Sequence, residues 1–167
     1  KFHSGAGYQY EDSVIYGFTH TNKGHWNLCH IPLLPVTGTP TPGDYCSPFS
    51  HERESAAPGY YQVFLDSDGV DAQLSSTLRC AFHKYTYPAS AAASLLADLQ
   101  RSNEHVRAWD IRKEGDNVFA GWQQTGEKMY FYAVANRPVT GIEPVVEGDR
   151  EVRIVRFGEG DGALELR

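Results

Sequence analysis

Several features that would point to a particular function are scarce in this sequence of 167 residues. No apolar run approaches the ~20 consecutive residues that a helix needs to cross a bilayer. Basic residues are outnumbered, with 15 Lys and Arg against 21 Asp and Glu, which gives a net charge of −6. Because nucleic acids and anionic membranes are held by basic patches, this balance argues against both as partners.

Cysteine is scarce as well, with only Cys29, Cys46 and Cys80 in the chain. Three thiols allow at most one intrachain disulfide and leave one thiol over. We expect mostly free thiols, with a Cys29–Cys46 bridge as the alternative. The cysteine count does not assign the protein to a redox compartment.

Short catalytic motifs are also missing from the sequence. It has no Gly-x-Ser-x-Gly elbow, no phosphate-binding loop, no Cys-x-x-Cys and no His-Glu-x-x-His. These absences remove the most recognisable signatures of serine hydrolases, nucleotide-binding proteins, thiol oxidoreductases and zinc peptidases.

What the sequence does contain is a period-two alternation of apolar and polar residues, which is typical of half-buried strands. Turn sequences rich in Gly and Asp at 66–69, 114–116 and 125–127 predict three hairpins. Short strands separated by such turns predict an all-β fold, an antiparallel β-sandwich that forms a single domain over residues 1–167. The expected strands are Tyr60–Leu65, Val70–Leu78, Cys80–Tyr87, Val106–Arg112, Asn117–Gln124, Lys128–Ala135, Glu151–Phe157 and Ala163–Leu166.

Residues 88–101 are compatible with either a helix or a strand. The Ala- and Leu-rich composition of 88–101, with Pro88 near its start, favours a short helix, whereas Leu95–Leu99 would equally suit a buried strand.

The chain begins at Lys1 without a signal peptide and stops within an alternating pattern at 162–167. We therefore expect a fragment that is truncated at both ends.

The first candidate functional segment is residues 16–30, in which His20, His25 and His30 recur every five residues. The three side chains could converge on a metal ion, but their spacing matches no standard zinc motif. We favour a sugar-contacting loop, in which Trp26 offers an apolar platform while His and Asn side chains bond to hydroxyls. The alternative for Trp26 is a place in the core.

The second candidate segment is residues 49–61. Glu52 and Glu54 are two residues apart and would point the same way in an extended chain. Paired carboxylates perform glycoside hydrolysis, one as acid and one as base or nucleophile. We favour the simpler interpretation, a charged loop in which Arg53 and His51 are the partners of these carboxylates.

Together and in this order, the two segments resemble the N-terminal domain of glycoside hydrolase family 92, the exo-acting α-mannosidases. The matching pieces extend over about half of the chain. They are Tyr16–His20, Ile31–Gly38, Phe49–Glu52 with Glu54, Ala57–Val63, Gly69–Thr77, Arg79, Phe82–Pro88 and Leu95–Leu99.

The resemblance implies one part of a calcium-dependent, inverting enzyme that cleaves α-mannoside glycans. In that family a β-sandwich precedes a catalytic (α/α) barrel, and the active site lies between them. The acid, the base and the calcium ligands come mainly from the barrel, which is absent here. The resemblance therefore implies no catalytic or metal-ligating residue in this chain and no activity of this fragment alone. It also implies a periplasmic or secreted protein and favours a strand at Leu95–Leu99.

In this chain, the resemblance implies that residues 16–30 and 44–54 shape the mannoside site. Trp26 and Tyr45 would wall the sugar, and His20 and His25 would bond to its hydroxyls. The alternatives are a free-standing carbohydrate-binding sandwich without catalysis and a purely structural docking domain. Residues expected to face the substrate are Phe18, His20, His25, Trp26, Tyr45 and Cys46.

Two departures from the family pattern lie within these segments. Residues 23–30 replace a longer stretch that is rich in Gly and Asp in the family, and Pro48 stands where an arginine is common. We therefore expect the preferred linkage or leaving group to differ here.

Overall fold

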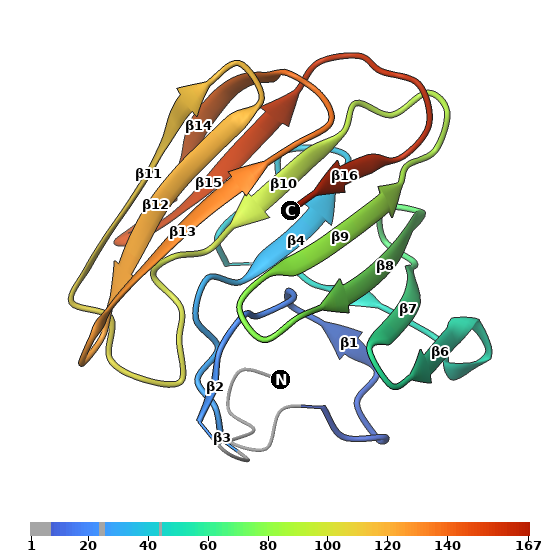
Figure 1. Ribbon diagram of the computed structural model, residues 1–167, viewed down its shortest axis with the longest axis horizontal. Coiled ribbons are helices and arrows are strands. Elements are labelled where there is room, and N and C mark those ends of the chain that lie inside the picture. Colours follow the sequence, from blue (N-terminus) through green and yellow to red (C-terminus); the bar gives the residue numbers. More distant parts are fainter. Residues whose placement is uncertain (1–7, 24–25, 44) are drawn as a thin grey trace.

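The computed structural model describes residues 8–23, 26–43 and 45–167. Within this part of the chain the regular structure is β-strand, apart from one 3-10 turn, η1 (His51–Arg53). The all-β fold and the antiparallel sandwich expected from the sequence are confirmed (Figure 1). No helix among the described residues has the length and apolarity to cross a membrane.

Three antiparallel sheets form the body of the molecule (Figure 1). The four-stranded sheet consists of β14 (Val139–Glu147), β15 (Arg150–Phe157), β10 (Ser94–Ala97) and β4 (Leu33–Val36) in that order. The five-stranded sheet consists of β16 (Leu164–Leu166), β9 (Ala81–Thr86), β8 (Val70–Ser76), β7 (Tyr60–Leu65) and β6 (Glu54–Ala57). The three-stranded sheet consists of β11 (Ala108–Gly115), β12 (Val118–Gln124) and β13 (Lys128–Val134).

Two short pairs of strands complete the fold near the N-terminus. β1 (Val14–Ile15) pairs with β5 (Ser47–Pro48), so backbone hydrogen bonds join the residues that directly precede the two candidate segments. β2 (Asn22–Lys23) pairs with β3 (Trp26–Asn27) as a hairpin within the first candidate segment.

One continuous core lies between the sheets. Side chains from all three sheets contribute to it, for example Tyr85 of β9, Ile154 of β15 and Phe119 of β12, each with 0% exposure. Burying this apolar surface is the main driving force for the fold. Because both candidate segments are anchored on this core, their relative positions are fixed by packing.

Residues 94–97 form a strand, as the family resemblance favoured. β10 lies between β15 and β4, with Leu95 opposite both Val155 and Pro35. All four residues of β10 are buried, because the strand is covered on both faces. A continuous apolar run of this length suits a doubly covered strand, and this tertiary context overrides the helical propensity of the local sequence.

The eight strands expected from alternation and the three predicted hairpins are present, with shifts of a few residues at the strand ends. The alternation pattern missed β4, β6 and β14. β14 contains Gly141 and Pro144, residues that weaken a strand signal, and it lies at the edge of its sheet with a bulge near Gly141. The three cysteines are free thiols, as favoured from the sequence.

Candidate functional site

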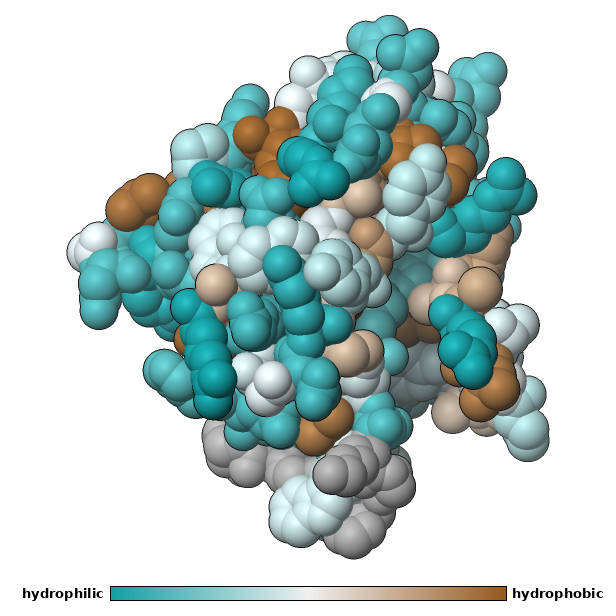
Figure 2. All heavy atoms as spheres, turned by 60° about the vertical axis from the view of Figure 1, so that its left-hand side comes forward, coloured by the Kyte–Doolittle hydropathy of each residue, from teal (hydrophilic) through white to brown (hydrophobic). Residues whose placement is uncertain are grey.

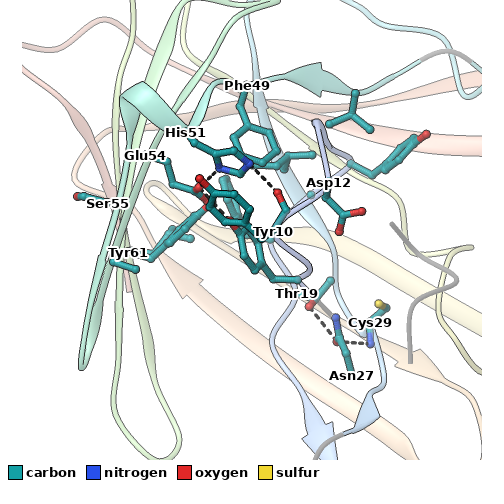
Figure 3. A pocket seen from close by; sticks show the side chains of 18 residues that line it. Tyr10, Asp12, Thr19, Asn27, Cys29, Phe49, His51, Glu54, Ser55 and Tyr61 are labelled. Carbon is teal, nitrogen blue, oxygen red and sulfur yellow. Dashed lines mark hydrogen bonds and ion pairs between the residues drawn. The ribbon is translucent and has the colours of Figure 1, made fainter. Parts of the chain in front are cut away.

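A cavity of about 610 Å³ lies where the two candidate segments meet (Figure 3). Its volume is in the range of small-molecule sites in proteins, and most of its lining is apolar or aromatic. The first segment contributes Phe18, Thr19 and Asn27, and the second contributes Phe49 and Glu54. Residues far apart in the sequence therefore form one concave surface.

Glu54 is the most highly bonded polar group of this cavity. Its side chain is only 9% exposed and accepts three hydrogen bonds. One carboxylate oxygen accepts from the Tyr61 hydroxyl at 2.6 Å. The other accepts from the Tyr8 hydroxyl at 3.0 Å and from Nδ1 of His51 at 2.5 Å. The carboxylate thus ties together β6, β7, η1 and the N-terminal segment.

His51 is held between Glu54 and the chain around Tyr10. Its Nε2 donates to the Tyr10 carbonyl at 2.6 Å, and the two rings stack with centroids 4.2 Å apart. Since Nδ1 also faces a carboxylate, both ring nitrogens act as donors, which describes the imidazolium form. The hydrogen bond to Glu54 accordingly raises the pKa of His51.

The same network shifts the pKa of the other groups. Burial alone would raise the pKa of Glu54, but hydrogen bonds from Tyr61, His51 and Tyr8 outweigh burial and lower it. Burial and the bond to Glu54 raise the pKa of Tyr8 to about 12 and raise that of Tyr61 further. Glu54 is therefore a carboxylate and both tyrosines are neutral donors at neutral pH, which makes Glu54 a poor general acid.

The opposite wall of the cavity is built by a tight turn in the first segment. Oδ1 of Asn27 accepts from the backbone N–H of Cys29 at 3.0 Å and from the Thr19 hydroxyl at 3.2 Å. This local bond supports Cys29 in a left-handed conformation with φ of 56°. Burial raises the pKa of the Cys29 thiol, so the thiol stays protonated at neutral pH.

His20 belongs to a directed chain of buried hydrogen bonds behind this wall. Its Nδ1 donates to the Ile31 carbonyl at 2.7 Å, so in the neutral ring Nε2 must accept. Nε2 of His83 donates to it at 3.1 Å, and Nδ1 of His83 accepts from the Tyr85 hydroxyl at 2.5 Å. This arrangement requires His20 to be neutral, because its protonation would place two N–H groups against each other, and burial favours the neutral form of His83.

Acid is therefore expected to destabilise the protein through His20 and His83. Burial lowers the pKa of both, that of His83 to about 3. The unfolded state binds protons near pH 6.5 and the folded state binds them only at lower pH, so stability falls as pH drops below 6.5, and for His83 it continues to fall towards pH 3. The loss is at most about 1.4 kcal/mol per pH unit for each histidine. Urea unfolding between pH 7.5 and 5 measures this dependence.

The matched comparison for this prediction is His83→Gln against His105→Gln, because His105 is exposed. His51 contributes in the opposite direction, since its raised pKa stabilises the fold at lower pH, and both variants retain it. The His83 variant should show a weaker pH dependence than the His105 variant. Equal slopes would show that the buried pair does not titrate on unfolding.

The two described histidines of the first segment, His20 and His30, do not share a metal site. His20 pairs with His83, whereas His30 contacts Glu104 and the Thr125 hydroxyl, each at 3.1 Å. His25 lies outside the described residues. Across residues 8–23, 26–43 and 45–167, no group of three or more His, Cys, Asp or Glu is placed to hold a metal ion.

The cavity also does not fit the calcium ion that the family resemblance implies for the full enzyme. Calcium takes six to eight oxygen ligands. Both oxygens of Glu54 already accept hydrogen bonds, and Oδ2 of Asp12, the other carboxylate of the lining, accepts from the Gln9 amide at 3.2 Å. The two carboxylates of the described cavity lining therefore do not form a calcium ligand set.

The residues predicted to face the substrate have different environments. Phe18 lines the cavity, and Trp26 is 55% exposed on β3. Cys46 is half-buried and lies outside the lining. Tyr45 is only 4% exposed, and its hydroxyl donates to buried Asp98, so its ring forms part of the core. This burial argues against the sugar-stacking role expected for Tyr45.

The paired carboxylates expected on one face are separated by the structure. Turn η1 interrupts the extended chain. Glu52 is therefore exposed at the surface, whereas Glu54 turns inward towards the cavity. The charged-loop interpretation is right for His51, which pairs with Glu54. It is wrong for Arg53, which pairs with Asp66 and lies over the ring of Phe64.

Sequence reasoning missed the tyrosines that surround the cavity. Tyr8 and Tyr10 precede the first candidate segment, and Tyr61, the last residue of the second segment, was given no role of its own. Tyr8 and Tyr61 donate hydrogen bonds to Glu54, and the ring of Tyr10 stacks on that of His51. The signal available in the sequence was the density of tyrosine on both sides of the two segments.

The family model described as the glycosyl hydrolase family 92 N-terminal domain matches residues 1–161. Among curated proteins, none matches the sequence.

Solved structures show the same fold. The family GH92 α-mannosidase BT3965 from Bacteroides thetaiotaomicron gives a TM-score of 0.85 at 23% identity, over 99% of this chain and 27% of that one. The same mannosidase in complex with mannoimidazole gives 0.82 at 23% identity, over 97% and 26%. The family GH92 inverting mannosidase BT2199 from that organism gives 0.78 at 20% identity, over 99% and 26%. The chain thus spans about a quarter of the length of these structures.

Proposed function

Because the chain belongs to glycosyl hydrolase family 92, whose N-terminal domain it represents, we propose that it forms part of an exo-acting α-mannosidase and shapes its mannoside site. The observation that carries this proposal is the convergence of the two family-like segments on one cavity. Mannoimidazole, which is bound by a structural relative, supports a mannoside as the ligand.

The lining of the cavity suits a sugar. A pyranose ring has apolar C–H faces and a rim of hydroxyls. An exposed ring of the lining such as Tyr10 can pack against a face, because the π-face of an aromatic ring is electron-rich, whereas Phe18 and Phe49 are nearly buried and offer only the part of each ring that borders the cavity. The Thr19 hydroxyl and the Asn27 amide provide hydrogen-bonding groups at the rim. Specificity would then come from a few polar groups in an apolar cavity.

We assign this domain a binding role and no catalytic role. Glu54 is kept ionised by three donors, so it cannot deliver a proton readily, and its lowered pKa also makes it a weak base. For an inverting mechanism, the acid and the base would come from parts of the enzyme beyond this chain, separated widely enough to admit water. We propose that the barrel following this domain supplies them, together with the ligands of a calcium ion. A periplasmic or secreted location is also proposed, on family membership alone.

The test of this role is Trp26→Ala in the α-mannosidase that contains this domain. Trp26 is 55% exposed next to the cavity-lining Asn27, so its loss removes a sugar platform without opening the core. We expect kcat/KM for an α-mannoside to fall at least about tenfold, the equivalent of one good binding contact. Leu78→Ala is the control, because Leu78 is 94% exposed outside both segments. Equal effects of the two substitutions would refute the role of the first segment.

A further inference from the structure

The outer face of the three-stranded sheet carries aromatic side chains that the cavity does not use. We call Trp122, Tyr130 and Tyr132 the aromatic stripe. Tyr130 and Tyr132 are 70% and 65% exposed, and Tyr130 lies directly opposite Trp122 on the neighbouring strand. None of the three lines the cavity. Figure 2 turns this side of the molecule towards the reader and shows pale side chains gathered among hydrophilic ones.

The alternation of β13 places these rings in solvent while the strand remains anchored. Met129 and Phe131 point to the other face and pack against the core. Tyr130 and Tyr132 are therefore held about 7 Å apart along one strand, the repeat of every second residue. Ala120 lies opposite Tyr132, and its small side chain leaves one side of that ring uncovered by its cross-strand neighbour.

The charges beside the stripe are compensated within the same sheet. Arg112 binds Asp110 at 3.1 Å and Glu114 at 2.6 Å. The ammonium group of Lys128 lies 3.5 Å from the centre of the Trp122 ring, where the π-system attracts it. A charged partner would gain little from this surface. A neutral ligand with apolar faces and many hydroxyls matches exposed rings beside paired polar groups.

We propose that the aromatic stripe is a second glycan-binding surface, which takes a neutral oligosaccharide or polysaccharide lying along β13. Successive sugar rings would pack on Tyr130 and Tyr132. The sugar hydroxyls would reach the ammonium group of Lys128 and three charged side chains of β11, those of Asp110, Arg112 and Glu114. The surface would hold a polymeric substrate close to the enzyme. That the sugar is mannose rests on the proposed function.

Affinity electrophoresis of the full chain in gels that contain a soluble α-mannan tests this proposal. The unaltered chain should be retarded by the polysaccharide. The double variant Tyr130→Ala/Tyr132→Ala should bind at least about tenfold more weakly, as loss of central aromatic contacts does. Phe82→Ala is the matched control, since Phe82 is an exposed aromatic residue on the five-stranded sheet, outside both candidate segments. The single variant Tyr132→Ser, expected to weaken binding in the same direction, serves if the double variant fails to fold.

Three outcomes would overturn the proposal. In the first, α-mannan does not retard the unaltered chain. In the second, the double variant binds as well as the unaltered chain. In the third, the cavity variant Glu54→Gln loses binding while the stripe variant keeps it. The last result would leave the proposed function of the cavity standing. The stripe could instead be a contact between two copies of the chain, which sedimentation velocity without glycan tests. A lower molecular mass for the double variant than for the unaltered chain would assign the stripe to self-association.

Discussion

Replacing Gln123 with leucine is expected to lower the free energy of unfolding by about 3 kcal/mol or more. The Gln123 side chain has 0% exposure and makes three hydrogen bonds to backbone groups, each of 2.9 Å. Its oxygen accepts from Ile31, and its nitrogen donates to the carbonyls of Leu99 and Arg101. Leucine has a similar volume but leaves these groups unpaired, and each buried unpaired group costs about 1–3 kcal/mol.

The loss should spread to the candidate site because Gln123 supports a strained turn. Ile31 has φ of 53°, a left-handed conformation that a β-branched residue adopts only when its surroundings enforce it. Its N–H is held by Gln123 and its carbonyl by His20. Urea unfolding measures the effect. The control is Gln124→Leu, the next position along β12, whose side chain is partly exposed. Similar losses for both variants would contradict the assigned role of Gln123.

Replacing Glu54 with glutamine is expected to release the cluster that closes one side of the cavity. An amide cannot match a carboxylate as the acceptor for Tyr61, Tyr8 and His51. We expect the free energy of unfolding to fall by about 2 kcal/mol, chiefly through the buried hydrogen bond from Tyr61. The pKa of His51 should also fall towards its ordinary value, because the bond to Glu54 is what raises it.

Nuclear magnetic resonance titration of the His51 ring reports this pKa directly, and urea unfolding reports stability. Glu52→Gln is the control, since Glu52 lies in the same 3-10 turn but is exposed. It should leave both quantities unchanged. A His51 pKa that is the same in both variants would show that Glu54 does not hold the imidazolium.

Local sequence pattern determined much of the fold. In β13, Lys128, Tyr130 and Tyr132 alternate with Met129 and Phe131, and the structure shows the predicted alternation of exposed and core-facing side chains. The turn at 125–127 likewise joins β12 to β13 as its Gly predicts. Such features depend on neighbours in sequence, so the sequence is sufficient to predict them.

Long-range contacts could not be predicted in the same way. His20 meets His83 across 63 positions, and Tyr45 finds its acceptor, Asp98, across 53. Neither partner has any local relation to the residue that it bonds. Tyr45 therefore looked like a loop aromatic that was free to stack on sugar, and its burial emerged only when β10 brought Asp98 into the core.

The candidate site was likewise predictable from the sequence only in part. The sequence singled out the two segments, and the pairing of β1 with β5, the strands that directly precede them, brings them together. It did not distinguish Glu54 from Glu52, because the inward turn of Glu54 depends on η1 and on donors from β7 and the N-terminal segment. Residue type and spacing identified the segments, whereas burial decided which of their side chains face the cavity.

The most direct test of the central claim is a crystal structure of the full-length protein that contains this domain, which we propose to be an α-mannosidase, determined with mannoimidazole bound. We predict that the sugar-shaped inhibitor contacts the cavity between Phe18 and Asn27 on one wall and Phe49 on the other. An inhibitor bound entirely by other parts of the enzyme, with no contact to this cavity, would contradict the proposed role of the domain.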